Sequence, residues 1–161
     1  MKIVIAGSTG LVGSSLTNFF QERGHNVIGI NRSIVDLLDK TATIDFLSSL
    51  KTEVVIDAAA KVGGINANSN YPVEFLNDNL RIQSNLMEAC HLAKVNRFIF
   101  LGSSCIYPRD AAQPIKEEYL MSGPLEKTNS AYAIAKIAGI ELIKSYRKEY
   151  GHKWISLMPT N

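Results

Sequence analysis

Cysteine, tryptophan and long apolar runs are all scarce in this sequence of 161 residues, which holds two cysteines and one tryptophan. Cys90 and Cys105 alone cannot build a disulfide framework, and they fit a reducing compartment. Only four apolar residues follow Lys2 before Gly7, too few for the apolar region of a signal peptide. No run approaches the length of a membrane span. We therefore expect a cytoplasmic protein without a membrane partner.

The sequence also has almost no excess of charge of one sign. The formal net charge at pH 7 is +2, and the lysines and arginines are scattered along the chain. Proteins that hold nucleic acid through its phosphates concentrate basic residues in a patch or stripe, so we expect no nucleic-acid partner. His25, His91 and His152 show no metal-ligand spacing with Cys, Asp or Glu, and no metal site is predicted.

Short apolar runs alternate with helical patterns along the whole chain. Hydrophobic residues make up 46% and charged residues 20%, which is ordinary for a single globular domain. The predicted strands are 3–6, 26–30, 54–56, 98–101 and 154–158. The first predicted helix follows the glycines near residue 10 and ends at residue 23. The other predicted helices cover 41–50, 72–93 and 130–150, and loops are predicted at 62–68 and 108–125. This alternation predicts an α/β fold over residues 1–161, a doubly wound, Rossmann-like parallel sheet.

A glycine-rich turn joins the first strand to the first helix. Gly7, Gly10 and Gly13 permit a tight turn and close backbone approach, and the helix that follows offers free N–H groups to a pyrophosphate. The spacing differs by one residue from the common G-x-G-x-x-G pattern. The strand–turn–helix context nevertheless favours dinucleotide binding over a turn that serves packing alone.

Arg32 follows the second predicted strand, where NAD-binding proteins commonly place an acidic residue for the ribose 2′-hydroxyl. Arginine suits a 2′-phosphate instead, and the missing carboxylate removes repulsion against it. We therefore expect NADPH rather than NADH; the alternative is that Arg32 is simply a solvated loop cation.

Four reactive side chains are expected to meet at one place. Ser103 and Cys105 follow the fourth strand, and an extended exit would point both the same way. Tyr132 and Lys136 lie four residues apart on a helix and share a face. The lysine would lower the pKa of the phenol, Ser103 would hold a substrate carbonyl, and Tyr132 would donate a proton as hydride arrives. The alternatives are a core-edge tyrosine beside a solvated lysine, and a Cys105 that only packs.

The helix beginning at Pro72 carries apolar residues on more than one face. We expect it to pack on the sheet and also on a second body, such as a partner subunit. Asn79 and Asn85 on this helix are interpreted as polar positions that are satisfied locally.

Several motifs together resemble the GDP-L-fucose synthases, which are extended short-chain dehydrogenase/reductases. They are the glycine turn and segments 58–65, 101–108, 132–139 and 158–161. The resemblance implies an NADPH-dependent enzyme that epimerises GDP-4-keto-6-deoxy-mannose at carbons 3 and 5 and then reduces the ketone. It implies catalytic roles for Ser103, Tyr132 and Lys136, with Cys105 as the epimerisation base or acid, and a homodimer formed through the long helices. The cofactor-binding residues that it implies, together with the glycine turn, are Gly7, Ser8, Thr9, Gly10, Leu11, Val12, Gly13, Arg32, Asp36, Leu37, Ala58, Leu101, Gly102, Ser103, Ser104, Lys136, Pro159, Thr160 and Asn161.

Two parts of the family pattern have no match here. The histidine that partners the cysteine and the substrate-gripping C-terminal half both lie beyond Asn161. We therefore expect this chain to bind cofactor but to turn over little or no substrate by itself. Two other hypotheses are a different nucleotide-sugar epimerase or reductase of the same superfamily, and a truncated, non-catalytic module that binds nucleotide or dimerises.

Overall fold

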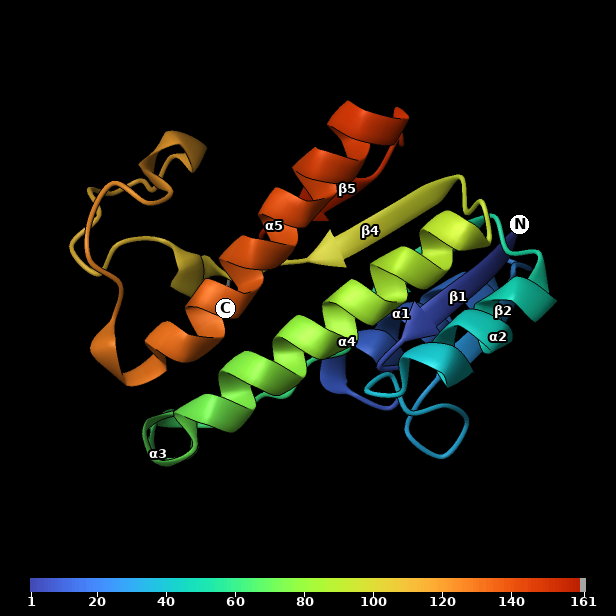
Figure 1. Cartoon of the computed structure of the whole chain (residues 1–161), viewed down its shortest axis with the longest axis horizontal. Helices are drawn as coiled ribbons and strands as arrows, with labels where there is room; N and C mark the ends of the chain where they lie inside the picture. Colours follow the sequence, from blue (N-terminus) through green and yellow to red (C-terminus); the bar gives the residue numbers. More distant parts are fainter. Residues whose placement is uncertain (160–161) are drawn as a thin grey trace.

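The computed structural model describes residues 1–159 and consists of one parallel sheet with helices on both faces (Figure 1). The strands are β1 (Lys2–Ala6), β2 (Asn26–Ile30), β3 (Val54–Asp57), β4 (Arg97–Leu101) and β5 (Ile155–Leu157). The helices are α1 (Leu11–Glu22), α2 (Lys40–Leu50), α3 (Ile65–Asn70), α4 (Pro72–Leu92) and α5 (Ser130–Tyr150). Single 3₁₀ turns are η1 (Ser104–Ile106), η2 (Glu117–Tyr119) and η3 (Lys127–Asn129).

The sheet order is β2-β1-β3-β4-β5, and every neighbouring pair is parallel. The chain therefore leaves β1 toward one edge and returns to the other side of β1 with β3. Ligands of such sheets bind at this switch point, outside the carboxyl ends of the strands. The predicted doubly wound α/β fold is confirmed.

Alternation along the strands divides the core into two layers. Val4, Val55 and Phe100 face a large cluster under α2, α4 and α5, whereas Ile3 and Ile5 face a smaller one under α1. Figure 1 shows these three helices side by side on one face of the sheet. The strands are buried on both faces because helices cover both, which explains their continuous apolar runs.

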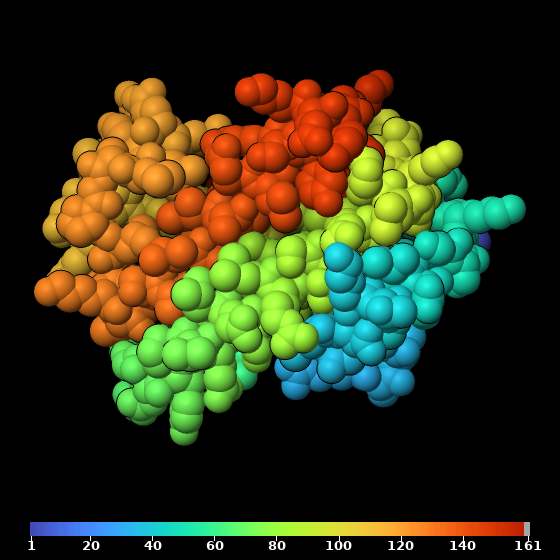
Figure 2. Space-filling view, viewed as in Figure 1, coloured from blue at the N-terminus to red at the C-terminus, as the bar shows by residue number. Residues whose placement is uncertain are grey.

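Helix α4 begins with Pro72 at its first turn, as predicted, and it lies between α2 and α5 across the molecule (Figure 2). Its second apolar face packs on these two helices of the same chain, so a partner subunit is not required to bury it. Leu76 and Leu80 remain half-buried outside the core cluster. Among residues 1–159, no helix combines the length and apolar character needed to cross a membrane.

Two local predictions were wrong. The segment predicted as a loop at 62–68 contains the start of α3, which begins after Gly64 and packs near η3. The exit of β4 is not extended beyond Ser103: the chain turns at once into η1, with Ser103 as its N-cap. In both places a side chain that bonds the backbone decides the local conformation, as Asn68 Nδ2 does by donating to the Gly63 carbonyl at 2.8 Å.

Candidate active site

The turn after β1 is built on close backbone contacts. Gly7 has φ +76°, and its N–H donates to the Ile30 carbonyl at 2.9 Å, as does that of Ser8 at 3.0 Å. A Cβ on Gly7 would lie 2.7 Å from the Ala58 carbonyl oxygen, and one on Gly13 would collide with the carbonyl of Gly7. Glycine is therefore required at both positions for the turn to close and for α1 to start against it.

The first turn of α1 has no side-chain cap. Its N-cap is Gly10, which has no side chain to accept a hydrogen bond from the first amides. Amides of this kind carry partial positive charge and favour an anionic ligand. The turn thus leaves donors directed at the carboxyl end of the sheet.

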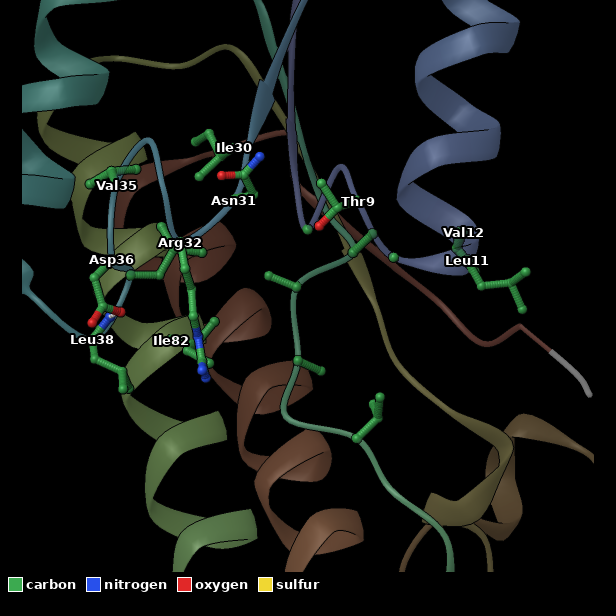
Figure 3. Close-up of a pocket in the computed structure, with 17 residues that line it drawn as sticks. Thr9, Leu11, Val12, Ile30, Asn31, Arg32, Val35, Asp36, Leu38 and Ile82 are labelled. Atoms are coloured by element: carbon green, nitrogen blue, oxygen red, sulfur yellow. Dashed lines mark hydrogen bonds between the residues drawn. The ribbon is translucent and has the colours of Figure 1, made fainter.

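A cavity of about 490 Å³ opens in front of this turn, between β1, β2 and β3. Figure 3 shows Arg32 extending into it from the end of β2, toward Ile82, with Thr9 across from it. Of the predicted cofactor-binding residues, those that line it are Gly7, Thr9, Gly10, Leu11, Val12, Arg32, Asp36, Leu37 and Ala58.

The other predicted cofactor residues lie elsewhere. Ser8 turns away and donates from Oγ to the Ile30 carbonyl at 3.2 Å, and Gly13 is packed beneath the turn. Segment 101–104 and Lys136 belong to the neighbouring reactive group, and Pro159 is exposed outside the cavity. Thr160 and Asn161 fall outside the described residues.

Sequence reasoning did not anticipate several residues of the cavity wall. Asn31 and Leu38 adjoin predicted residues, and Ala59, Ala60 and Val62 continue the segment after β3. Ile82 comes from the middle of α4, and no sequence pattern distinguishes it from an ordinary core residue.

The reactive group lies where β4 ends beside the N-terminal half of α5. Lys136 is only 3% exposed, and its ammonium donates to the Leu101 carbonyl at 2.8 Å. The same ammonium lies 4.6 Å from the centre of the Phe100 ring and 6.0 Å from that of Tyr132. Helical spacing and the end of β4 thus bring tyrosine and lysine to one place, as predicted.

Ser103 and Cys105 lie near this pair, but a 3₁₀ turn rather than the expected extended segment places them there. The backbone N–H of Cys105 donates to Ser103 Oγ at 3.3 Å, which closes the η1 turn. Both residues lie near enough to Tyr132 to act on the pKa of its phenol, which Ser103 lowers and Cys105 raises. The turn, not the alternation of an extended strand, holds both side chains near Tyr132.

The pKa of Tyr132 is raised, mainly because the ring is buried. Cys105 adds to this effect, while the nearby Ser103 side chain opposes it. The expected lowering by Lys136 is not found among the protein groups that act on the phenol. Burial lowers the pKa of Lys136 itself. The protein alone therefore keeps Tyr132 protonated near neutrality, with a proton to donate.

Two asparagines of α4, Asn79 and Asn85, hold segments of the chain near the cavity. Asn79 is buried, accepts from the Lys61 backbone N–H at 2.8 Å and donates to the Lys61 carbonyl at 3.0 Å. Asn85 Nδ2 donates to the Leu37 carbonyl at 2.8 Å. The interpretation of Asn79 as locally satisfied is confirmed in part, because its Nδ2 also donates to the Phe75 carbonyl one turn earlier at 2.6 Å. For Asn85 it was wrong, and both asparagines tie α4 to a distant segment of the chain. The segment after β3 is further held by ion pairs from Lys61 to Glu74 and Asp78.

Comparison with known proteins agrees with this geometry. The profile described as the NAD dependent epimerase/dehydratase family matches residues 3–161. The chain belongs to the NAD dependent epimerase/dehydratase family. The predicted membership of a superfamily of nucleotide-dependent epimerases and reductases is thereby confirmed.

Individual members of the family are also similar. The chain is 48% identical to GDP-L-fucose synthase of Escherichia coli K12 and 47% identical to GDP-L-fucose synthase 1 of Arabidopsis thaliana, each over 161 residues. These matches cover 99% of this chain and 50% of each relative, so the chain spans about half the length of the curated relatives it matches. A solved GDP-mannoheptose C4 reductase from Campylobacter jejuni with NADP bound superposes with a TM-score of 0.95 at 37% identity, covering 99% of this chain and 51% of the other.

Proposed function

We propose that this chain forms the cofactor-binding part of a GDP-L-fucose synthase, an NADPH-dependent epimerase and reductase that converts GDP-4-keto-6-deoxy-mannose to GDP-L-fucose. The observation that carries this proposal is the adjacency of two sites. The cavity in front of the glycine turn, with Arg32 on its wall, includes the residues that follow β3, and the serine, cysteine, tyrosine and lysine group lies at the end of β4, the strand paired with β3. The 46–49% identity to GDP-L-fucose synthases over nearly the whole chain supports the choice of substrate.

The residues present fit NADPH. The turn at Gly7 and Gly13 is a cradle that a Cβ would fill, and the uncapped start of α1 suits a pyrophosphate. Arg32 suits the 2′-phosphate, and the nearby Asp36 carboxylate is already engaged, accepting from the Leu38 N–H at 3.0 Å. When bound, the cofactor supplies the hydride for ketone reduction. NADP in the similar C. jejuni reductase supports this assignment.

In the reduction, Ser103 holds the substrate carbonyl oxygen and Tyr132 donates its phenolic proton to that oxygen as the carbon is reduced. The raised pKa of Tyr132 keeps this proton in place beforehand. The family resemblance gives Lys136 the role of stabilising the phenolate that remains, from its position 6.0 Å from the centre of the Tyr132 ring; Lys136 has no resolved effect on the pKa of the resting phenol.

In the epimerisation, Cys105 removes or returns a proton at a carbon next to the same carbonyl. The electron pair left on that carbon moves into the carbonyl, whose oxygen is stabilised by Ser103 and Tyr132. Return of a proton on the opposite face restores the ketone with inverted configuration. One polarised carbonyl thus serves both reactions.

The wild-type chain tests the extent of this function. We expect residues 1–161 to bind NADPH in calorimetry but to show little loss of nicotinamide absorbance with GDP-4-keto-6-deoxy-mannose, because these residues span about half the length of the GDP-L-fucose synthases they match. Substantial turnover would refute the expectation that groups outside residues 1–161 are needed. Absence of NADPH binding would refute the proposed function itself.

A variant tests the cofactor preference. Arg32→Ala should weaken NADPH binding by tenfold or more, because a charge-assisted contact to phosphate contributes about 1.5–3 kcal/mol. NADH binding should change little. Equal weakening of both cofactors would contradict a 2′-phosphate contact. Arg23→Ala, on the exposed end of α1, is the matched control.

A second candidate function is an epimerase or reductase of another GDP-sugar. The solved reductase of a GDP-mannoheptose, at 37% identity, favours this alternative.

In a full-length context, Cys105→Ser should suppress solvent deuterium exchange at the epimerised carbons while sparing reduction of a pre-epimerised ketone. Unchanged exchange would mean that Cys105 only packs.

We also propose a homodimer formed through α4 and α5, in the cytoplasm. Leu76 and Leu80 of α4 are half-buried outside the core, and Ile134 of α5 is 48% exposed. Both cysteines are free, which suits a reducing compartment. Sedimentation equilibrium tests the association: Ile134→Lys should yield a monomer if these helices form the contact.

A further inference from the structure

A buried carboxylate that the mechanism above does not use lies directly behind the reactive group. Asp57 is the last residue of β3 and is fully buried. Its Oδ1 accepts from the Ala59 N–H at 3.1 Å, whereas its Oδ2 is buried without a hydrogen-bond partner. Ionising a buried carboxyl group that has one oxygen without a hydrogen-bond partner is costly, so a nearby positive group must compensate for the charge.

Strand register places Asp57 next to Lys136. Asp57 pairs with Phe100 across β3 and β4, and strand alternation puts Val55 and Phe100 in the cluster under α4 and α5. The Lys136 ammonium lies 4.6 Å from the Phe100 ring, on this same face. The carboxylate and the ammonium therefore lie on the same face of the sheet beside Phe100, and both residues are buried.

Lys136 has no carboxylate in direct contact within residues 1–159. Its ammonium makes one hydrogen bond in this part of the chain, to a neutral carbonyl. We propose that Asp57 is the counter-charge of Lys136, a positioning residue that keeps the lysine charged beside Tyr132. This inference deepens the proposed function, since the charge on Lys136 matters to catalysis only if the Tyr132–Lys136 pair works as described there.

Mutual effects on the two groups agree with this geometry. Burial raises the pKa of Asp57 to about 6, and Lys136 opposes that rise. Burial lowers the pKa of Lys136, and Asp57 opposes that fall. Coupling of this kind is reciprocal by thermodynamic necessity. Asp57 is mostly ionised above pH 6 and then supports the cation.

The other groups around Asp57 do not replace Lys136 as its partner. From α4 comes Cys90, whose pKa burial raises well above its usual value. From α5 comes Tyr132, whose pKa the Asp57 charge raises slightly. On β1, Asp57 pairs with Ala6. Lys136 is thus the one cation among these neighbours, and an ionised Asp57 helps both to charge the lysine and to keep the phenol protonated.

Carbon-13 NMR of the full chain labelled at aspartate Cγ tests the coupling without cofactor or substrate. The Asp57 signal is the one that disappears in Asp57→Asn. We expect it to titrate near pH 6 in the wild type, and to shift upward by about one unit or more in Lys136→Met. The matched control, Lys144→Met on the exposed side of α5, should leave the midpoint unchanged.

An unchanged midpoint in folded Lys136→Met would overturn the inference. If Lys136→Met fails to fold, the reciprocal measurement decides: in Asp57→Asn, the labelled Cε of Lys136 must titrate at lower pH than in the wild type, and an equal or higher value refutes the coupling. Because neither titration requires NADPH, failure here is distinct from failure of the proposed function, which cofactor binding reports.

Discussion

Replacing Asp57 by asparagine should change how the stability of this protein depends on pH. The folded state raises the pKa of Asp57 from 3.8 to about 6, so the folded chain holds this proton more tightly than the unfolded chain does. Stability is therefore lost as pH rises from the unfolded value through the folded one. This is opposite to the usual behaviour of a salt-bridged carboxylate.

The magnitude follows from the size of the shift. About two pKa units correspond to about 3 kcal/mol in total, at about 1.4 kcal/mol per unit. Part of this stability has already been lost by pH 5, where the carboxyl of the unfolded chain is already ionised. Integration of the linkage relation leaves about 1 kcal/mol to be lost between pH 5 and pH 8.

The assay is guanidinium unfolding at pH 5, 6, 7 and 8, followed by the fluorescence of the single tryptophan, Trp154, which is fully buried. The stability of the wild type minus that of Asp57→Asn should fall by about 1 kcal/mol from pH 5 to pH 8. Any pH-independent cost of burying the asparagine amide cancels in this comparison. Asp45→Asn, an exposed site on α2, should show no such trend.

A flat difference between wild type and Asp57→Asn would refute the reasoning. It would mean that the carboxyl ionises in the folded protein as easily as in water. A difference that grows with pH would show instead that Asp57 is held by a strong direct partner, which the unpartnered Oδ2 contradicts.

Three further substitutions probe the supports of the site. Gly13→Ala should lower stability by about 1–3 kcal/mol and abolish NADPH binding in calorimetry, because the new methyl group collides with the carbonyl of Gly7; unchanged binding would mean that α1 can move away from the turn. Asn79→Leu should lower stability by about 1–3 kcal/mol and speed amide exchange around Lys61, whose backbone it fixes; exchange that stays slow would show that the ion pairs alone hold this segment. Burial lowers the pKa of His152 from 6.5, so stability falls as pH drops below about 6.5, and His152→Phe should flatten that fall in thermal melts; an unaltered slope would place the acid sensitivity elsewhere.

The sequence alone determined the order of the elements and most of the reactive groups. An apolar run that ends at a glycine marks β1, and α5 begins and ends where its pattern does, at Ser130 and Tyr150. Such signals are local, because periodicity and turn chemistry act over a few residues. The Tyr132–Lys136 pair follows from helical spacing for the same reason.

Tertiary structure decided which groups act on one another. Asp57 is an ordinary residue at the end of an apolar run until the pairing of β3 with β4 sets it beside Phe100 and α5 buries it. Asn79 gains its role only when the segment after β3 folds back onto α4. The pKa of Tyr132 depends on burial, which spacing along a helix does not report, so the sequence gives the partners of the phenol while the fold sets its protonation.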